Sequence, residues 1–414
     1  MQVNLSNTSW LTMASLILIE IFARFATHLA RGRLNEFPTV DVSALEKFVN
    51  YHPQLGWEPR PTSVPIADTG HTRRQSNTQS TKAKVTYKID VDGSRHHPPT
   101  TGLLRGGPIE IFGDSTVFCR GNRDDETYSY YLQHDHFLGP VKNFGVGNYG
   151  IDQAYLRAQL KMTGGGIAIL DLALQSIYRN VTVYKHYAEI GNNWAVKPRF
   201  KINPCSGELQ LLARPLRDRK ELAELQDHAS FLRVNDYFYN SFTANISQPG
   251  LSHSFYLANN KHALYEFSRS LPQRHLKATA PKIARALGKK PYRPHKDPDT
   301  LLRIAEGEGG EIVARIIKQF ESLAKDRGSN PLVVMSPQGF LLKHPRHCYE
   351  ISQQIMRHCS ELGAPLPRDF GSVLLDKAET EKARLGAYNV HMSPRGNRVK
   401  ADWLANEIQR LPEI

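Results

Sequence analysis

The feature that most constrains the fold is the alternation of short apolar runs with amphipathic helical patterns. Apolar runs at Ile109–Phe112 and Ile167–Leu174 predict buried strands, and the pattern from about Asp152 predicts a helix between them. Strands that alternate with helices form a parallel sheet with crossover helices. Residues 105–181 are therefore expected to form the first part of an α/β domain.

The same alternation returns near the C-terminus, so residues 330–414 are expected to complete this domain. Residues 182–329 are polar and basic with helical patches such as Leu301–Ala324, and are interpreted as an insertion or subdomain. The remaining expected strands are Val141–Phe144, Pro331–Met335 and Val373–Leu375, and the remaining helices are Cys348–Leu362 and about Asn397–Arg410.

The N-terminal quarter differs in composition. Residues 1–33 carry an apolar helical pattern, and residues 34–104 are poor in apolar runs, which favours an extended linker with exposed loop at Pro59–Ala83. Leu11–Ala30 is interrupted by Glu20, Arg24 and His28, and it therefore falls short of the ~20 consecutive apolar residues of a clean membrane span. We expect it to hold the protein on a membrane, by spanning it or by lying in the interface; the alternative is an N-terminal helix that packs on the domain. The arginines follow the apolar run, which by the positive-inside rule places the domain in the cytoplasm if the helix spans.

The net charge limits the classes of partner, and the cysteine pattern indicates how the cysteines are used. Lys and Arg number 53 against 40 Asp and Glu, a formal net charge of +13, which favours anionic partners. The basic run Arg274–Lys296 carries no nucleic-acid-binding motif, so an acidic glycan or lipid headgroup is expected rather than nucleic acid. The four cysteines form no CxxC pair and are expected to be small buried hydrophobes.

Two polar segments carry the candidate chemistry. The strand Ile109–Phe112 runs directly into Gly113–Ser115, and catalytic groups of parallel sheets lie beyond the carboxyl ends of strands. Ser115 is expected to begin a helix there, where unpaired N–H groups stabilise an oxyanion; N-capping explains the same residues without catalysis. His391, in a loop before the last helix, is the candidate base that activates this serine.

These segments resemble the blocks of the SGNH, or GDSL-like, hydrolases. Ile109–Ser115 is similar to their first block, Asn143–Gly150 to the second, and His391 with Gly396 to the last. The resemblance covers about residues 105–180 and 330–410. It implies a three-layer α/β/α sandwich and hydrolysis or transfer of an ester-linked acyl group, including acetyl on a glycan or lipid, without cofactor or metal.

The resemblance also implies site residues. The oxyanion hole falls to the N–H groups of Ser115 and Asn148, the latter where the family has glycine, and to Gln175 where the family has asparagine. The acid expected three residues before His391 is replaced by Tyr388, followed by Asn389, and neither is a carboxylate. The acid comes from elsewhere, a Ser–His dyad acts without one, or catalysis has been lost.

Two further sets of residues resemble bacterial members of this family. Ile19-Glu20 with Arg24 and Gly56-Trp57 is similar to members that have an N-terminal membrane helix, and Ile177–Asn180 with Lys197–Phe200 is similar to a subgroup of these proteins. This resemblance favours a periplasmic domain. The side of the membrane therefore stays open between the charge rule and the resemblance.

Four alternatives stand beside this interpretation. Gly145–Gly150 reads as G-x-G-x-x-G with Asp171 about twenty residues later, the pattern of a dinucleotide site. Two histidine pairs, His134/His136 and His96/His97, are weak metal candidates without a ligand framework. The aromatic run Tyr237–Phe242 is either a sugar- or acyl-binding wall or core packing. A non-catalytic module of the same fold that binds an anionic glycan or lipid is the alternative of a different class.

Overall fold

The computed structural model describes residues 7–38, 49–62, 66–73, 83–98, 106–136, 139–212, 216, 218, 220–245, 254, 293–386 and 391–412. The chain divides into two compact units. The sheet unit comprises Val42–Val183, Val196–Arg219 and His295–Ile414, and the helical unit comprises Met1–Asp41, Tyr184–Ala195 and Lys220–Pro294. Residues 196–219 and 295–329, which the sequence assigns to an insertion, thus belong to the sheet unit.

The sheet unit is built on a five-stranded sheet in the order β11-β10-β7-β5-β6. Every neighbouring pair in it is parallel, which confirms the expected α/β class with a parallel central sheet. In register, Gly113 at the end of β5 pairs with Asp171 of β7, which pairs with Val334 of β10. The strands are β5 (Ile109–Gly113), β6 (Val141–Asn143), β7 (Ile167–Ala173), β10 (Asn330–Ser336) and β11 (Arg368–Asp369).

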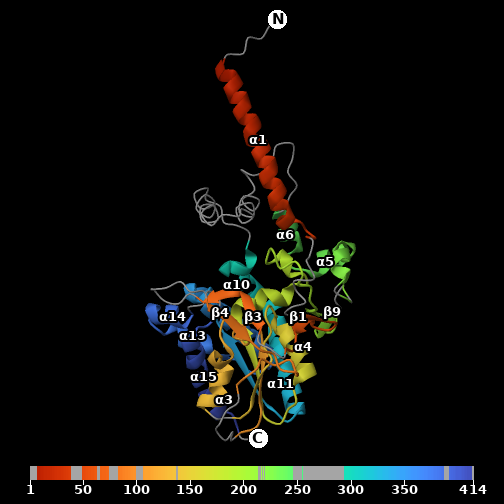
Figure 1. Cartoon of the computed structure of the whole chain (residues 1–414). Coiled ribbons are helices and arrows are strands. Elements are labelled where there is room, and N and C mark those ends of the chain that lie inside the picture. The colour runs from red at the N-terminus through yellow and green to blue at the C-terminus, as the bar shows by residue number, and fades with distance from the viewer. Residues whose placement is uncertain are drawn as a thin grey trace. The chain divides into compact units, whose positions relative to one another are not determined.

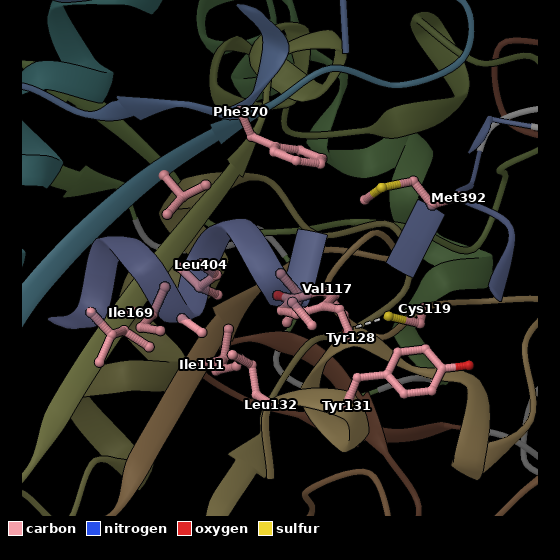
Figure 2. Packing of buried hydrophobic residues seen from close by; sticks show 14 of the residues in the cluster. Ile111, Val117, Cys119, Tyr128, Tyr131, Leu132, Ile169, Phe370, Met392 and Leu404 are labelled. Atoms are coloured by element: carbon pink, nitrogen blue, oxygen red, sulfur yellow. Dashed lines mark hydrogen bonds between the residues drawn. The ribbon is translucent and has the colours of Figure 1, made fainter. Parts of the chain in front are cut away.

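Helices cover both faces of this sheet (Figure 1). One face packs on α3 (Tyr128–Asp135) and α15 (Pro394–Gln409), the other on α4 (Ile151–Lys161) and α11 (Glu308–Asp326). Strand residues alternate between the faces because successive side chains point to opposite sides. Figure 2 shows Ile111 and Ile169 packed with Leu132 and Leu404 from α3 and α15.

The opposite face is aromatic. Phe112 of β5 stacks on Phe144 with ring centroids 5.2 Å apart and meets Phe320 of α11 edge-on at 6.5 Å. The other helices and short strands of the sheet unit are α10 (Pro298–Glu306), α12 (Pro345–Leu362), α13 (Phe370–Leu375), α14 (Glu379–Leu385), the 3-10 helices η1 (Asp124–Glu126), η2 (Leu174–Val181), η5 (Pro294–Lys296) and η6 (Leu341–Lys343), and the hairpin β8 (Arg199–Ile202) with β9 (Leu209–Leu212).

One expected strand is wrong. The apolar run Val373–Leu375 lies in helix α13, and the last strand of the sheet is the two-residue β11 directly before it. The side chain of Asp369 accepts a hydrogen bond from the Gly371 amide at 2.7 Å, which caps the helix and ends the strand early.

The expected linker at residues 34–104 contains folded structure among its described residues. Two hairpins pair β1 (Val49–His52) with β2 (Gly56–Pro59) and β3 (Ile66–Arg73) with β4 (Ala83–Tyr87). Trp57 is buried and its indole N–H donates to the Gly147 carbonyl at 3.0 Å. Single apolar residues in a polar background thus pack this segment on the sheet unit, which explains why no apolar run marks it.

The helical unit contains α1 (Asn7–Leu34), η3 (Lys185–Tyr187), η4 (Lys220–His228), α5 (Ala229–Asn235) and α6 (Tyr239–Asn245). Phe242 is fully buried, with its ring centroid 5.0 Å from that of Tyr187. Tyr239 and Phe238 are buried as well, while Tyr237 is 47% exposed. Three of the four aromatic rings in Tyr237–Phe242 therefore pack in the core of this unit and cannot form a wall for sugars.

Helix α1 exposes large apolar side chains. Seven are more than half exposed: Leu16, Ile17, Leu18, Ile19, Ile21, Phe22 and Phe25. Among the described helices, none combines the length and apolarity that a membrane crossing requires. The basic run Arg274–Lys296 lies almost entirely outside the described residues.

Candidate active site

The loop after β5 presents the candidate nucleophile. Ser115 is largely buried at 6% exposure, directly beyond the carboxyl end of the strand. The Asp114 carboxylate accepts hydrogen bonds from the Thr116 amide at 2.8 Å and the Thr116 hydroxyl at 2.5 Å, which closes a tight turn around Ser115.

The expected helix at Ser115 is wrong. Residues 114–122 form consecutive turns, and Cys119 within them has a positive φ of 55°. The positive φ of Cys119 takes the chain off the helical path, and the Arg120 amide then bonds to the Ser115 carbonyl five residues back, at 3.1 Å. A helix dipole is therefore not available at this serine, and any oxyanion must be held by individual donors.

The second block lies against this turn. The Val146 amide donates to the Gly113 carbonyl at 3.1 Å, and the buried Asn143 side chain donates to the Val117 carbonyl at 2.7 Å. A Cβ on Gly145 would lie 2.3 Å from the Phe118 amide nitrogen, so only glycine fits. The packing of Gly145 on the Ser115 turn thus explains why glycine is needed at this position, which is also the first glycine of the dinucleotide pattern.

Asn148 adopts a left-handed backbone with φ of 71°. Asparagine tolerates this region better than most residues, which explains how it stands where the resembling family has glycine. Gln175 follows the end of β7 in η2 and is 5% exposed. Its Oε1 has no hydrogen-bond partner among the described residues, so its amide is buried without full satisfaction.

The segment that carries His391 is fixed to the same loop. His391 is 5% exposed, and the carbonyl of the next residue, Met392, accepts a hydrogen bond from Asn122 Nδ2 at 3.0 Å. Asn397 of α15 donates to the Glu126 carbonyl at 2.8 Å. The structure thereby joins the His391 segment to the loop that begins at Ser115. Tyr388 and Asn389 lie outside the described residues.

A network around Asp114 links the loops after three strands. Its Oδ2 accepts hydrogen bonds from Ser176 Oγ at 2.7 Å, Arg179 Nη1 at 3.1 Å and Gln338 Nε2 at 3.3 Å. Ser176 and Arg179 follow β7, and Gln338 follows β10. Burial lowers the pKa of the Arg179 guanidinium, and the Asp114 charge opposes that shift. We call these four residues the Asp114 network.

A second network lies between the sheet and α15. Asp171 of β7 forms an ion pair with Lys400 and accepts hydrogen bonds from Ser336 Oγ at 2.7 Å and the Tyr128 hydroxyl at 3.0 Å. Burial, together with the Asp171 charge, raises the pKa of the Tyr128 hydroxyl well above its ordinary value. We call these four residues the Asp171 network. The Asp171 carboxylate thus has its partners within the core of the protein and is not available to bind a dinucleotide.

Sequence analysis considered Asp171 only within the dinucleotide pattern and Asp114 only as an N-cap residue, and it assigned no role to the other members of either network. Two motifs singled out by resemblance nevertheless contribute buried ion pairs. Arg179 pairs with Asp114, and Lys197 pairs with Asp152 at the start of α4. Burial raises the pKa of the Asp152 carboxyl, and the Lys197 charge opposes this shift. In the sequence, Arg179 and Lys197 each stand among apolar or aromatic residues. Such a context predicts that the cation is buried in an ion pair, but it does not identify the acidic partner.

The histidine pairs have other partners. His97 contacts the Val141 carbonyl at 3.0 Å and Ser129 Oγ at 2.8 Å, and His134 contacts the Pro98 carbonyl at 3.1 Å. His96 and His136 contact Asp90 and Asp402, at 2.9 and 3.0 Å. Within the described ranges, no three His, Cys, Asp or Glu side chains gather as a metal site. Cys119, Cys348 and Cys359 are buried as expected, whereas Cys205 is exposed.

Comparison with known proteins gives little. No protein-family model matches the chain, and no curated protein matches it. A solved crystal structure of a protein 12% identical in sequence matches 74% of this chain and 98% of its own, with a TM-score of 0.35. A likeness this weak carries no argument, so the function is argued from the site alone.

Proposed function

We propose that this chain is an SGNH-type serine hydrolase that cleaves or transfers an ester-linked acyl group. Ser115 is the nucleophile, His391 the base, and the fold the three-layer α/β/α sandwich of that family. One observation carries the proposal: Asn122 binds the Met392 carbonyl, so the His391 segment lies on the loop that begins at Ser115. A serine needs a base within hydrogen-bond reach, and this link brings the two segments together across 270 residues of sequence.

The proposed reaction has two steps. His391 takes the Ser115 proton as Oγ attacks the acyl carbonyl, and the tetrahedral oxyanion is held by the N–H groups of Ser115 and Asn148 with the Gln175 amide as third donor. The imidazolium then protonates the departing alcohol, which leaves an acyl-serine. Water, or an acceptor hydroxyl, attacks this ester, and its proton passes through His391 back to Ser115. Acyl group, alcohol and protons balance without any cofactor.

The test is covalent labelling of the full chain with a fluorophosphonate, beside Ser115→Ala. The proposal expects labelling at Ser115 and release of p-nitrophenol from short-chain esters, both absent in the variant. Acetylated sugars, tested next, would identify the acyl group's carrier. A folded protein that neither labels nor hydrolyses, but binds acidic glycan or anionic vesicles, would instead support the non-catalytic module.

We also propose that Tyr388 makes the enzyme slow. A tyrosine hydroxyl, with its ordinary pKa of ~10, is neutral at pH 7 and cannot stabilise the imidazolium as a carboxylate does. Losing the charge of a triad acid lowers kcat by up to ~10⁴-fold. Tyr388→Asp should therefore raise kcat, and Tyr388→Phe should not. A carboxylate that leaves kcat unchanged would mean that another residue already orients His391.

Membrane association through α1 is part of the proposed function. Its seven exposed apolar side chains, from Leu16 to Phe25, are what a bilayer would cover. Deleting residues 1–33 should move the protein to the soluble fraction with esterase kcat intact. Full-length protein that stays in solution without detergent and does not bind anionic vesicles would contradict this part alone.

A further inference from the structure

One guanidinium nitrogen in the sheet unit contacts both loops that carry the proposed oxyanion-hole donors. Arg179 Nη1 donates to Asp114 Oδ2 at 3.1 Å and to the Tyr149 carbonyl at 2.9 Å. Asp114 directly precedes Ser115, and Tyr149 directly follows Asn148. The two donor N–H groups are thus each one residue from a group that Arg179 holds.

We infer that Arg179 is the positioning residue that sets the spacing between the Ser115 and Asn148 N–H groups. This inference rests on the proposed function, because it assigns the arginine a role only through those two donors. Arg179 does not touch the substrate in this account; it acts through Asp114 and the Tyr149 carbonyl.

The local backbone explains why such a link is needed. Residues 114–122 are turns without a helix to fix the Ser115 amide, and Asn148 has a left-handed φ of 71°, a conformation that an L residue keeps only when its surroundings impose it. An oxyanion hole works when its donors are held in place before charge develops. A misplacement of about 1 Å at a reacting centre can lower the rate ~10²-fold.

Burial makes the link rigid. Arg179 is 7% and Asp114 3% exposed, so water competes little for these hydrogen bonds. The side chain is held on another side as well, since Arg179 Nε contacts the Tyr178 hydroxyl at 3.1 Å. Ser176 and Gln338 keep the Asp114 carboxylate in place from the loops after β7 and β10.

A buried ion pair can also be purely structural, so the test must separate stability from positioning. Arg179→Met leaves the Asp114 charge buried and unpaired, which destabilises the fold. The double variant Asp114→Asn/Arg179→Met removes both charges, and the new amide can donate to Ser176 Oγ, so much of the stability should return. The link to the Tyr149 carbonyl stays broken in both.

Lys400 offers a matched control. Its side chain is fully buried and contacts one carboxylate, that of Asp171, and one hydroxyl, Ser336 Oγ at 2.8 Å. Neither Asp171 nor Ser336 adjoins Ser115 or Asn148. Lys400→Met therefore also leaves a buried carboxylate without its cation in the same unit, and it should lower the unfolding temperature while kcat is retained.

The experiment measures kcat, KM, the fluorophosphonate labelling rate at Ser115 and thermal unfolding for wild type and these variants, with a short-chain p-nitrophenyl ester. Arg179→Met and the double variant should both lose about 10- to 100-fold in kcat, with little change in KM, although their stabilities differ. Arg179→Lys keeps a cation that can donate to both acceptors but loses the Nε contact to the Tyr178 hydroxyl that orients the side chain, so it should lie between them and wild type.

Two results would overturn the inference. If kcat returns with stability in the double variant, or if Lys400→Met loses as much kcat as Arg179→Met, the arginine is only structural. A wild-type protein that neither labels nor hydrolyses overturns the proposed function itself, and this inference with it. The two failures are distinguishable because the second is seen without any Arg179 variant.

Discussion

The Asp114 and Asp171 networks place nearly the same chemistry in two regions of the sheet unit. Each has a buried carboxylate, a buried cation and two further donors, and Gly113, just before Asp114, pairs in register with Asp171. Their partners differ. Those of Asp114 come from η2 after β7 and from the loop after β10, whereas Lys400 lies within α15 and Tyr128 is the first residue of α3.

This difference indicates different roles. Helix α15 already packs on the sheet through Ala401, Leu404 and Ala405, so Lys400 adds specificity to a contact that apolar burial holds. The loops that carry Ser115 and Asn148 lack a helix, and they are joined to each other by hydrogen bonds such as those from Val146 to Gly113 and from Asn143 to Val117. The Asp114 network therefore fixes the positions of the loops at the carboxyl ends of the strands. The Asp171 network fixes the register of α15 on the sheet.

The largest effect is expected at the reacting groups. His391→Ala should lower kcat by about 10²-fold or more, to the level of Ser115→Ala, because Ser115 then has no base and the charge of a triad acid is already missing, while the unfolding temperature stays near that of wild type. The measurement is p-nitrophenyl ester turnover beside thermal unfolding, with Ser115→Ala as reference. Full turnover in His391→Ala would remove the C-terminal block from the site.

Lys400→Met should affect stability rather than chemistry. It leaves Asp171 buried without its cation, which destabilises by about 3–5 kcal/mol. Asp171→Asn/Lys400→Met should recover most of this, as both charges are gone and the amide can bond Ser336. Denaturant unfolding gives the free energies. If kcat of folded Lys400→Met falls as far as in Arg179→Met, the two networks do not differ in the way argued.

Two glycines test whether close packing positions the loop after β6 against the Ser115 turn. A Cβ on Gly145 would lie 2.7 Å from Val117 Cβ and force the second block away from the Ser115 turn, whereas a Cβ on Gly147 would meet nothing within 4 Å. Gly145→Ala should lose about 1–3 kcal/mol of stability and up to ~10²-fold in kcat. Gly147→Ala should be close to wild type in stability. Equal stability losses in both would contradict the packing argument.

The smallest effect is a pH dependence of stability on the α3 side. Burial lowers the pKa of His97 to about 3, from an ordinary value of 6.5. Below pH 6.5 the unfolded chain binds a proton that the folded protein does not take up until near pH 3, so stability falls as pH falls through this window. Between pH 7 and 5 the loss is at most about 2 kcal/mol. His97→Gln should flatten the profile; an unchanged slope would show that His97 does not cause it.

The main strands of the sheet and several of its helices could be predicted from the amino-acid sequence alone. The short, mostly apolar runs at β5, β7 and β10, interrupted only by Glu110 and Asp171, predict buried parallel strands, and helices such as α4 and α12 follow from apolar spacing. Three apolar residues at Val373–Leu375 were too few, and the Asp369 cap decided in favour of a helix. Ser115, Asn148 and His391 were chosen from local motifs, because their residue types and neighbours along the chain mark them.

The residues that surround Ser115, Asn148 and His391 could be identified only from the folded structure. Arg179 meets Asp114 across 65 residues, Gln338 meets it across 224, and Asn122 meets Met392 across 270. No local pattern encodes such pairs, because the free energy that selects a partner arises when both groups lose water in the same place. The left-handed Asn148 and the absence of a helix at Ser115 follow from that packing too, since the loops after β5 and β6 press on each other only once the sheet has formed.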